Sequence, residues 1–220
     1  ANLTETFEPR GLLIEEARTN QVSTSEQVGG ADRVTITANA ATAPDGTQTA
    51  IRLTEGNSLG RHKVDRGTAG NASTSYPRTV SCFFKMETRR YVGLQLHGTG
   101  TSTYVCNIID LQEGVITDKQ LGSNYKLEKY PNGWYRFSFT ITHTTNQNFT
   151  ISLSDRATLA GGNGLLEFGS PRYTGNNSNS LLVWGLQSES GSFPTSYIKT
   201  SGSTVTRSAD IASISGDNFG

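Results

Sequence analysis

Apolar and polar residues alternate with a period of two along several stretches of this chain. Successive side chains of a strand point to opposite faces of its sheet, so the alternation predicts strands with one apolar and one polar face. An antiparallel β-sandwich is built from such strands. The clearest stretches, with their apolar positions, are 80–86 (Val80, Cys82, Phe84, Met86), 91–97 (Val92, Leu94, Leu96), 134–141 (Tyr135, Phe137, Phe139, Ile141) and 149–153 (Phe149, Ile151, Leu153).

Turn-forming residues separate these stretches and recur often enough to predict roughly ten strands. Pro44-Asp45-Gly46 and Pro131-Asn132-Gly133 are examples, since they combine a fixed φ angle with a residue that tolerates positive φ. No helical periodicity extends beyond a turn or two, and its best candidate is Leu12–Arg18. The polar, glycine-rich stretch Asn57–Ser75 is predicted to be a long loop or a flexible connection.

Amino-acid composition and net charge indicate which classes of partner the protein is expected to bind. Of the 220 residues, 34% are hydrophobic and 24 are glycine, which favours short strands joined by polar turns. Lys plus Arg and Asp plus Glu both number 19, so no net charge attracts nucleic acid. The local patch Arg61-His62-Lys63 is interpreted as a solvated edge. No apolar run approaches the ~20 residues that span a bilayer, so membrane insertion is not expected.

Catalytic and metal-binding motifs are not found, and we expect a protein that is not an enzyme. The chain has no G-x-S-x-G nucleophile elbow and no phosphate-binding glycine motif. The adjacent Glu15 and Glu16 would point to opposite faces of a strand, which is unsuitable for a cooperating pair of carboxylates. Cys82 and Cys106 both lie in strand-like stretches, and two buried free thiols are favoured over a disulfide.

Several segments together resemble a β-sandwich module that recurs in bacteriophage tail fibres and other virion structural proteins. The opening resembles that module's GLLIE-x-x-R-T-N pattern, and further matches follow in the same order along the chain. The matching segments are Gly11–Asn20, Ala43–Thr47, Asn132–Arg136, Tyr173–Gly175, Leu181–Leu186, Phe193–Ile198 and Thr206–Asp210. The chain is also similar, more distantly, to jelly-roll carbohydrate-binding modules of the concanavalin-like lectin type.

The resemblance implies an all-β fold, an antiparallel β-sandwich of jelly-roll or lectin-like topology. It implies an N-terminal arm over residues 1–20 that packs on the sandwich, a sandwich over 21–200, and a C-terminal extension or linker over 201–220. Many sugar-binding jelly rolls hold a structural calcium ion, and Glu26, Gln187 and Asp210 could contribute oxygen ligands. Because no dense acidic loop is present, no cofactor is expected.

A sugar-binding surface needs an exposed aromatic ring beside groups that bind hydroxyls. Trp134 and Arg136 lie opposite the apolar positions of their stretch, and Tyr91, Gln95 and His97 lie opposite those of theirs. If the two strands share a sheet, these five side chains form a ligand-binding platform on its solvated face. The alternative is that Trp134 packs under the adjacent 125–131 segment as a buried corner residue.

These observations lead to three hypotheses. The first is a non-catalytic module of phage tail-fibre origin that binds a polysaccharide or cell-surface glycan. The second is a purely structural virion domain, and the third is a polysaccharide depolymerase whose site has no recognisable motif. The resemblance implies an extracellular or virion-surface location and a homotrimer within a longer fibre.

Overall fold

The computed structural model describes residues 13–66, 76–98, 104–120, 122–143, 147–159 and 166–212. These residues form β-strands and one short 3₁₀ turn, so the predicted all-β class is confirmed. No helix among them is long or apolar enough to cross a membrane.

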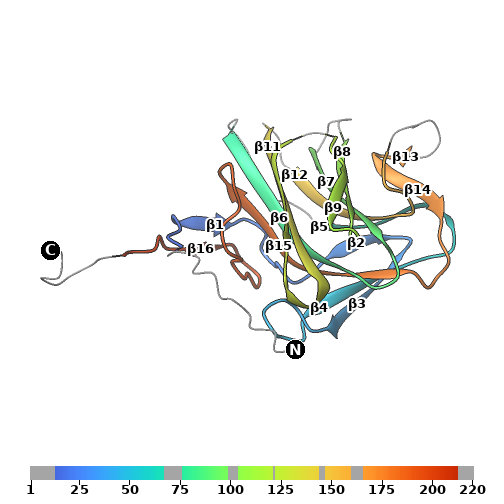
Figure 1. Ribbon diagram of the computed structural model, residues 1–220, viewed down its shortest axis with the longest axis horizontal. Coiled ribbons are helices and arrows are strands. Elements are labelled where there is room, and N and C mark those ends of the chain that lie inside the picture. The colour runs from blue at the N-terminus through green and yellow to red at the C-terminus, as the bar shows by residue number, and fades with distance from the viewer. Residues whose placement is uncertain are drawn as a thin grey trace, which may run out of the picture.

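The strands are numbered in chain order, and all of their pairings are antiparallel (Figure 1). Several of the strands that raise their number above the predicted ten are only two to four residues long. The elements are β1 (Arg18–Asn20), β2 (Gly29–Asp32), β3 (Val34–Ala41), β4 (Ala50–Glu55), β5 (Leu59–Arg66), β6 (Tyr76–Met86), β7 (Tyr91–Gly98), β8 (Tyr104–Asp110), β9 (Val115–Asp118), β10 (Ser123–Lys129), η1 (Pro131–Gly133), β11 (Trp134–His143), β12 (Gln147–Ser154), β13 (Leu166–Glu167), β14 (Ser170–Thr174), β15 (Ser180–Ser190) and β16 (Val205–Arg207).

Two sheets stack to form the sandwich. One is six-stranded in the order β10-β11-β6-β15-β4-β3, and the other is eight-stranded in the order β13-β14-β5-β12-β7-β8-β9, with β2 also paired to β5. The chain crosses between the sheets at β2 to β3, β4 to β5, β5 to β6, β6 to β7, β9 to β10, β11 to β12 and β14 to β15. The central strands β4-β15-β6-β11 and β5-β12-β7-β8 therefore have jelly-roll topology, as expected.

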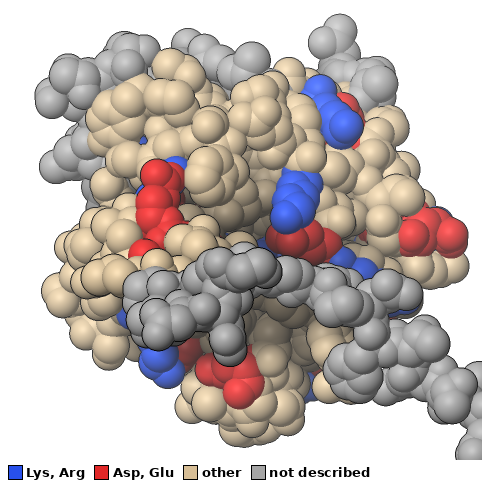
Figure 2. Space-filling view, turned by 60° about the vertical axis from the view of Figure 1, so that its left-hand side comes forward, with Lys and Arg blue, Asp and Glu red and all other residues tan. Residues whose placement is uncertain are grey.

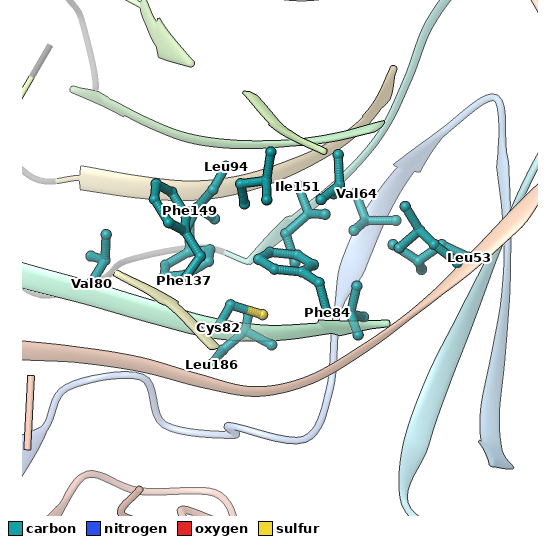
Figure 3. Packing of buried hydrophobic residues seen from close by; sticks show 14 of the residues in the cluster. Leu53, Val64, Val80, Cys82, Phe84, Leu94, Phe137, Phe149, Ile151 and Leu186 are labelled. Carbon is teal, nitrogen blue, oxygen red and sulfur yellow. The ribbon is translucent and has the colours of Figure 1, made fainter. Parts of the chain in front are cut away.

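The core lies between the two sheets and is made by the alternating apolar positions (Figure 3). Phe84 and Phe137 come from the six-stranded sheet, whereas Leu94, Phe149 and Ile151 come from the eight-stranded sheet. All five side chains are buried. The period-two prediction of which faces point inward is thus confirmed for β6, β7, β11 and β12.

The outer face of the six-stranded sheet is covered as well. Its central side chains form a second apolar cluster that contains Phe83, Trp134 and Trp184, with Tyr130 and Tyr197 packed against it. The segment around Tyr197 is tied to the N-terminal part of the chain, because the Ser25 hydroxyl lies 2.6 Å from the Tyr197 hydroxyl. The indole of Trp184 donates a hydrogen bond to Thr49 Oγ1 at 2.9 Å.

Residues near the two ends of the described chain form a small separate ribbon. β1 pairs with β16, and this two-stranded sheet lies at one side of the sandwich (Figure 1). The buried Asn20 side chain joins the ribbon to the body by donating to the carbonyl oxygens of Leu186 and Ile198. Leu13–Ala17 has no regular secondary structure.

The segment predicted as a loop over 57–75 is in part a central strand, which corrects that prediction. Leu59–Arg66 is β5, which pairs with β12, with β14 and with β2. The alternation of β5 could not be recognised in the sequence, because its inward positions include Gly60 and His62 rather than large apolar residues. The outward positions carry charge, so the strand has no recognisable apolar face. Residues 67–75 lie outside the described part of the chain.

The two cysteines are free, as predicted, because their side chains lie in two different apolar clusters. Cys82 lies in the core between the sheets, whereas Cys106 lies in a separate apolar cluster that belongs to the eight-stranded sheet. Burial raises the pKa of both thiols, that of Cys106 to about 12, so neither is a reactive thiolate at neutral pH.

Candidate functional site

The five residues predicted to form one platform lie on two different sheets. Trp134 and Arg136 belong to β11 in the six-stranded sheet, whereas Tyr91, Gln95 and His97 belong to β7 in the eight-stranded sheet. The predicted common platform is therefore wrong. Tyr91 is half-buried against an apolar cluster, and the side chain of His97 lies outside the described part of the chain.

Trp134 is 1% exposed and Arg136 is 4% exposed, so neither can serve as an open binding surface. Their direction was predicted correctly, since both point away from the inter-sheet core. The Arg136 guanidinium lies over the Phe83 ring at 5.4 Å and donates to Ser81 Oγ at 3.0 Å. The alternative of a buried corner residue describes Trp134 better, because the half-buried Tyr130 packs against the same cluster.

The outer face of the eight-stranded sheet is covered over only part of its width. Over β7 and β8, Cys106, Ile108 and Leu159 form a buried apolar cluster, with Tyr91 and Leu166 packed against it. Gly93 of β7 allows this close packing, because a Cβ atom there would lie 2.6 Å from Cys106 Sγ. Over β5 and β12 this face is polar, and among its described residues Arg61 and Asp65 are partly exposed whereas Lys63, Thr150 and Ser152 are buried.

A hollow of about 240 Å³ lies on this polar part of the sheet. Its lining side chains come from β5, β7, β12 and β14 and from the turn before β14. They include a guanidinium, an ammonium, a carboxylate, a carboxamide, two hydroxyls and an aromatic ring. The lining residues are Arg61, Lys63, Asp65, Gln95, Thr150, Phe168 and Ser170.

The aromatic ring of the hollow belongs to Phe168, which is 56% exposed. Phe168 and Gly169 form the two-residue turn between β13 and β14, with φ angles of 49° and 72°. Two positive φ angles define a type I′ hairpin turn, in which Asn-Gly is the favoured pair. A bulky aromatic residue is strained in this conformation. The chain thus holds an exposed ring at a position that is unfavourable for it.

Gln95 connects this turn to the sheet. Its side chain is 1% exposed, and its amide nitrogen donates to the carbonyl oxygen of Phe168 at 2.9 Å. Its amide oxygen accepts from Ser170 Oγ at 3.0 Å, and Ser170 Oγ also accepts from Ser152 Oγ at 2.9 Å. Of the five predicted residues, Gln95 therefore belongs to the site, where it positions the Phe168 turn.

The charged groups of the hollow are held as ion pairs. Arg61 Nε donates to Asp32 Oδ2 at 2.8 Å, and the Arg61 guanidinium carbon lies 4.7 Å from the centre of the Phe168 ring. Lys63 forms an ion pair with Asp65, whose other carboxylate oxygen accepts from Thr150 Oγ1 at 2.7 Å. Fixed charges of both signs therefore line one small surface.

The pKa of Asp32 shows the local balance of charge. Burial opposes ionisation of this carboxyl group, yet the hydrogen bond from Arg61 and the positive charges of Arg33, Arg61 and Lys63 lower the pKa of Asp32 below its usual value. Asp32 is therefore ionised at neutral pH and keeps Arg61 oriented beside Phe168.

Chemically, this arrangement suits the recognition of a polyhydroxylated ring. A sugar presents C–H groups on its ring faces and hydroxyls at its edge, which match an aromatic surface and paired donors and acceptors respectively. Asp65 is the one carboxylate among the lining residues, and its pairing with Lys63 and Thr150 occupies both oxygens. The hollow thus has the donors and acceptors that bind hydroxyl groups.

A second hollow of about 600 Å³ lies between β1 and the ends of β6 and β15. Its lining residues include Glu16, Arg18 and Gln21 from the N-terminal part of the described chain, together with Tyr76 and Ser190. Figure 2 shows the side of the molecule that carries β1, where residues of opposite charge lie close together and uncharged side chains predominate.

The three side chains considered for calcium already have protein partners. Glu26 pairs with Lys199 at 2.8 Å, the Gln187 carboxamide oxygen accepts from the backbone of Ile198, and Asp210 accepts from the backbone of Glu15. Within the described ranges, no three His, Cys, Asp or Glu side chains gather as metal ligands. The structure therefore offers no support for calcium at these positions.

Sequence reasoning missed most of the residues around the hollow. Arg61, Lys63 and Asp65 were assigned to a loop or a solvated edge, although their spacing of two is that of one strand face. For Phe168, the signal was an aromatic residue directly before a glycine. That signal is weak, because nothing local shows that the ring stays exposed.

Comparisons with known proteins reveal only distant similarity. No protein-family model and no curated protein matches the chain. One similar solved structure is the CBM22-1–GH10 region of Clostridium thermocellum endo-1,4-β-D-xylanase 10B in complex with xylohexaose. It has 9% identity and a TM-score of 0.46, and the match covers 84% of this chain but 30% of the xylanase chain. A mannan-recognising carbohydrate-binding module, TmCBM27, has 7% identity and a TM-score of 0.37 over 82% of this chain and 98% of that module.

Both similarities are too low in identity and in TM-score to indicate a function or a ligand for this chain. The jelly-roll assignment rests on the strand pairing described above. The functional argument rests on the hollow itself.

Proposed function

We propose that this chain is a non-catalytic carbohydrate-binding module, and that its site is the hollow over β5 and β12. One observation carries the proposal: the exposed Phe168 ring is fixed in a strained turn beside the charged and amide groups of Arg61, Asp65 and Gln95. Conformational strain at an exposed aromatic residue indicates a role other than stability. A sugar ring that stacks on Phe168 would place its hydroxyls against the paired donors and acceptors.

The affinity of such a site is expected to be modest. Its area is small and its charged groups are already paired, so a Kd between about 10⁻³ and 10⁻⁵ M is expected, which corresponds to roughly 4–7 kcal/mol. Attachment to a polysaccharide would then need several modules acting together. An extracellular location follows from this function, because polysaccharides of cell surfaces and matrices lie there.

The phage tail-fibre origin, the virion-surface location and the homotrimer stay predictions from sequence resemblance, since no comparison tests them. A purely structural virion domain is the alternative function. It is less favoured because structural packing does not explain an exposed ring in a strained turn. The depolymerase hypothesis stays the second alternative.

The test is a screen of the whole chain against diverse plant, algal and bacterial polysaccharides by affinity electrophoresis. Retardation by at least one polysaccharide is expected, and Phe168→Ala should abolish it. Phe193→Ala is the matched control, because Phe193 is 51% exposed and also contacts an arginine, Arg18, at 4.8 Å, but lies away from the hollow. Equal retardation of both variants and the wild type would refute the site.

A further inference from the structure

The size of the hollow limits what it can hold. Its volume of about 240 Å³ corresponds to roughly eight water molecules at ~30 Å³ each. Sites for drug-sized ligands occupy about 300–1,000 Å³. A single sugar ring matches this space.

On two sides of the hollow, described residues prevent a ligand from continuing across the sheet. On the side of β7 and β8, Leu159 and Leu166 cover Cys106 and Ile108, so the sheet face that would extend a groove is filled. Toward the end of β12, Ser152 is fully buried beneath Ser170 of β14.

The hairpin forms a further boundary. Phe168 stands at the tip of the β13–β14 turn, held to the sheet by Gln95 and against Arg61. Arg61 is in turn fixed by Asp32 of β2, which pairs with β5 next to β14, on the edge opposite β12. The ring therefore lies at the rim of the hollow, and none of the other described residues that line it is aromatic.

We infer that the site recognises one sugar ring, and so binds a chain end or a branch of a glycan rather than the interior of a main chain. This inference rests on the proposed function. Recognition of one sugar ring also agrees with the residues that line the hollow, because their hydrogen-bond donors and acceptors surround a single aromatic side chain.

The test compares ligands of different length. The probes are the methyl glycosides of glucose, mannose, xylose, galactose and N-acetylglucosamine, together with the β-1,4-linked hexasaccharides of the same sugars. Binding to the whole chain is measured by isothermal titration calorimetry, with Phe168→Ala as the site variant and Phe193→Ala as the control. For the sugar that binds, we expect the methyl glycoside and the hexasaccharide to differ in Kd by no more than about threefold.

The outcomes separate the two proposals. A hexasaccharide that binds more than about tenfold tighter than its methyl glycoside, with binding lost in Phe168→Ala, would overturn the single-ring inference but leave carbohydrate binding in place. No binding by any probe, with no retardation by any polysaccharide, would overturn both. If the methyl glycoside and the hexasaccharide bind with equal Kd values, and Phe168→Ala leaves these values unchanged, the sugar binds outside this hollow. That result would overturn the inference.

Discussion

Replacing Phe168 by asparagine separates a binding role of the ring from a structural one. Phe168 has a φ angle of 49°, and the left-handed conformation costs a residue with a Cβ atom roughly 1–2 kcal/mol. Asparagine tolerates this conformation and forms the favoured Asn-Gly type I′ turn with Gly169. The variant loses the contact with Arg61, which contributes about 0.5–1 kcal/mol at an exposed site. The balance predicts that Phe168→Asn is more stable than the wild type by up to about 1.5 kcal/mol, with the middle of the range near 0.75 kcal/mol.

Thermal and urea unfolding measure this change. For a chain of this size a gain near the middle of that range corresponds to a rise in Tm of roughly 1–4 °C. The control is Asn132→Phe, because Asn132 is an exposed residue with a φ of 59°, and an aromatic residue there should cost about 1–2 kcal/mol. The stabilised variant should at the same time lose glycan binding. A loss of more than about 1 kcal/mol in Phe168→Asn would show that the ring stabilises the fold, and the reasoning from strain would fail.

Three further outcomes are expected. Trp134→Ala should lower the free energy of unfolding by about 3–5 kcal/mol in urea titrations, and an unchanged stability would place the ring at the surface. Burial, only partly opposed by the charge of Glu55, lowers the pKa of His62 in the folded state. In the unfolded chain His62 binds a proton as the pH falls through about 6.5, whereas in the folded protein it binds that proton only at lower pH. The free energy of unfolding should therefore decrease below about pH 6.5. Urea midpoints between pH 7.5 and 5 should therefore fall less in His62→Gln than in the wild type, and parallel slopes would contradict this. Adding EDTA should leave the Tm unchanged, and a clear decrease would reveal a stabilising metal ion.

The fold could be predicted largely because alternation is a local property. Each of β6, β7, β11 and β12 carries enough large apolar residues for its inward face to be recognised from its own sequence. β5 could not be recognised, since Gly60 and His62 occupy inward positions and Arg61 and Lys63 occupy outward ones. Its place between β14 and β12 depends on partners far away in the chain.

The site was harder to predict because exposure is a long-range property. The face on which Trp134 lies was correctly derived, but segments such as that around Tyr197 cover it, and no residue near Trp134 indicates this. Phe168 stays exposed because its turn projects and because Gln95, distant in sequence, holds it. Gln95 was predicted to bind the ligand from the outward direction of its side chain alone. In the structure, its side chain positions the turn.

The central claim is that a sugar binds on the polar part of the eight-stranded sheet, and backbone amide chemical shifts test it most directly. The chain, labelled with ¹⁵N, is titrated with the glycan that retards it in electrophoresis. The account predicts shift changes that cluster at Lys63, Thr150 and Ser170 and disappear in Phe168→Ala. Changes confined to the other hollow, at Arg18 and Tyr76, would contradict it.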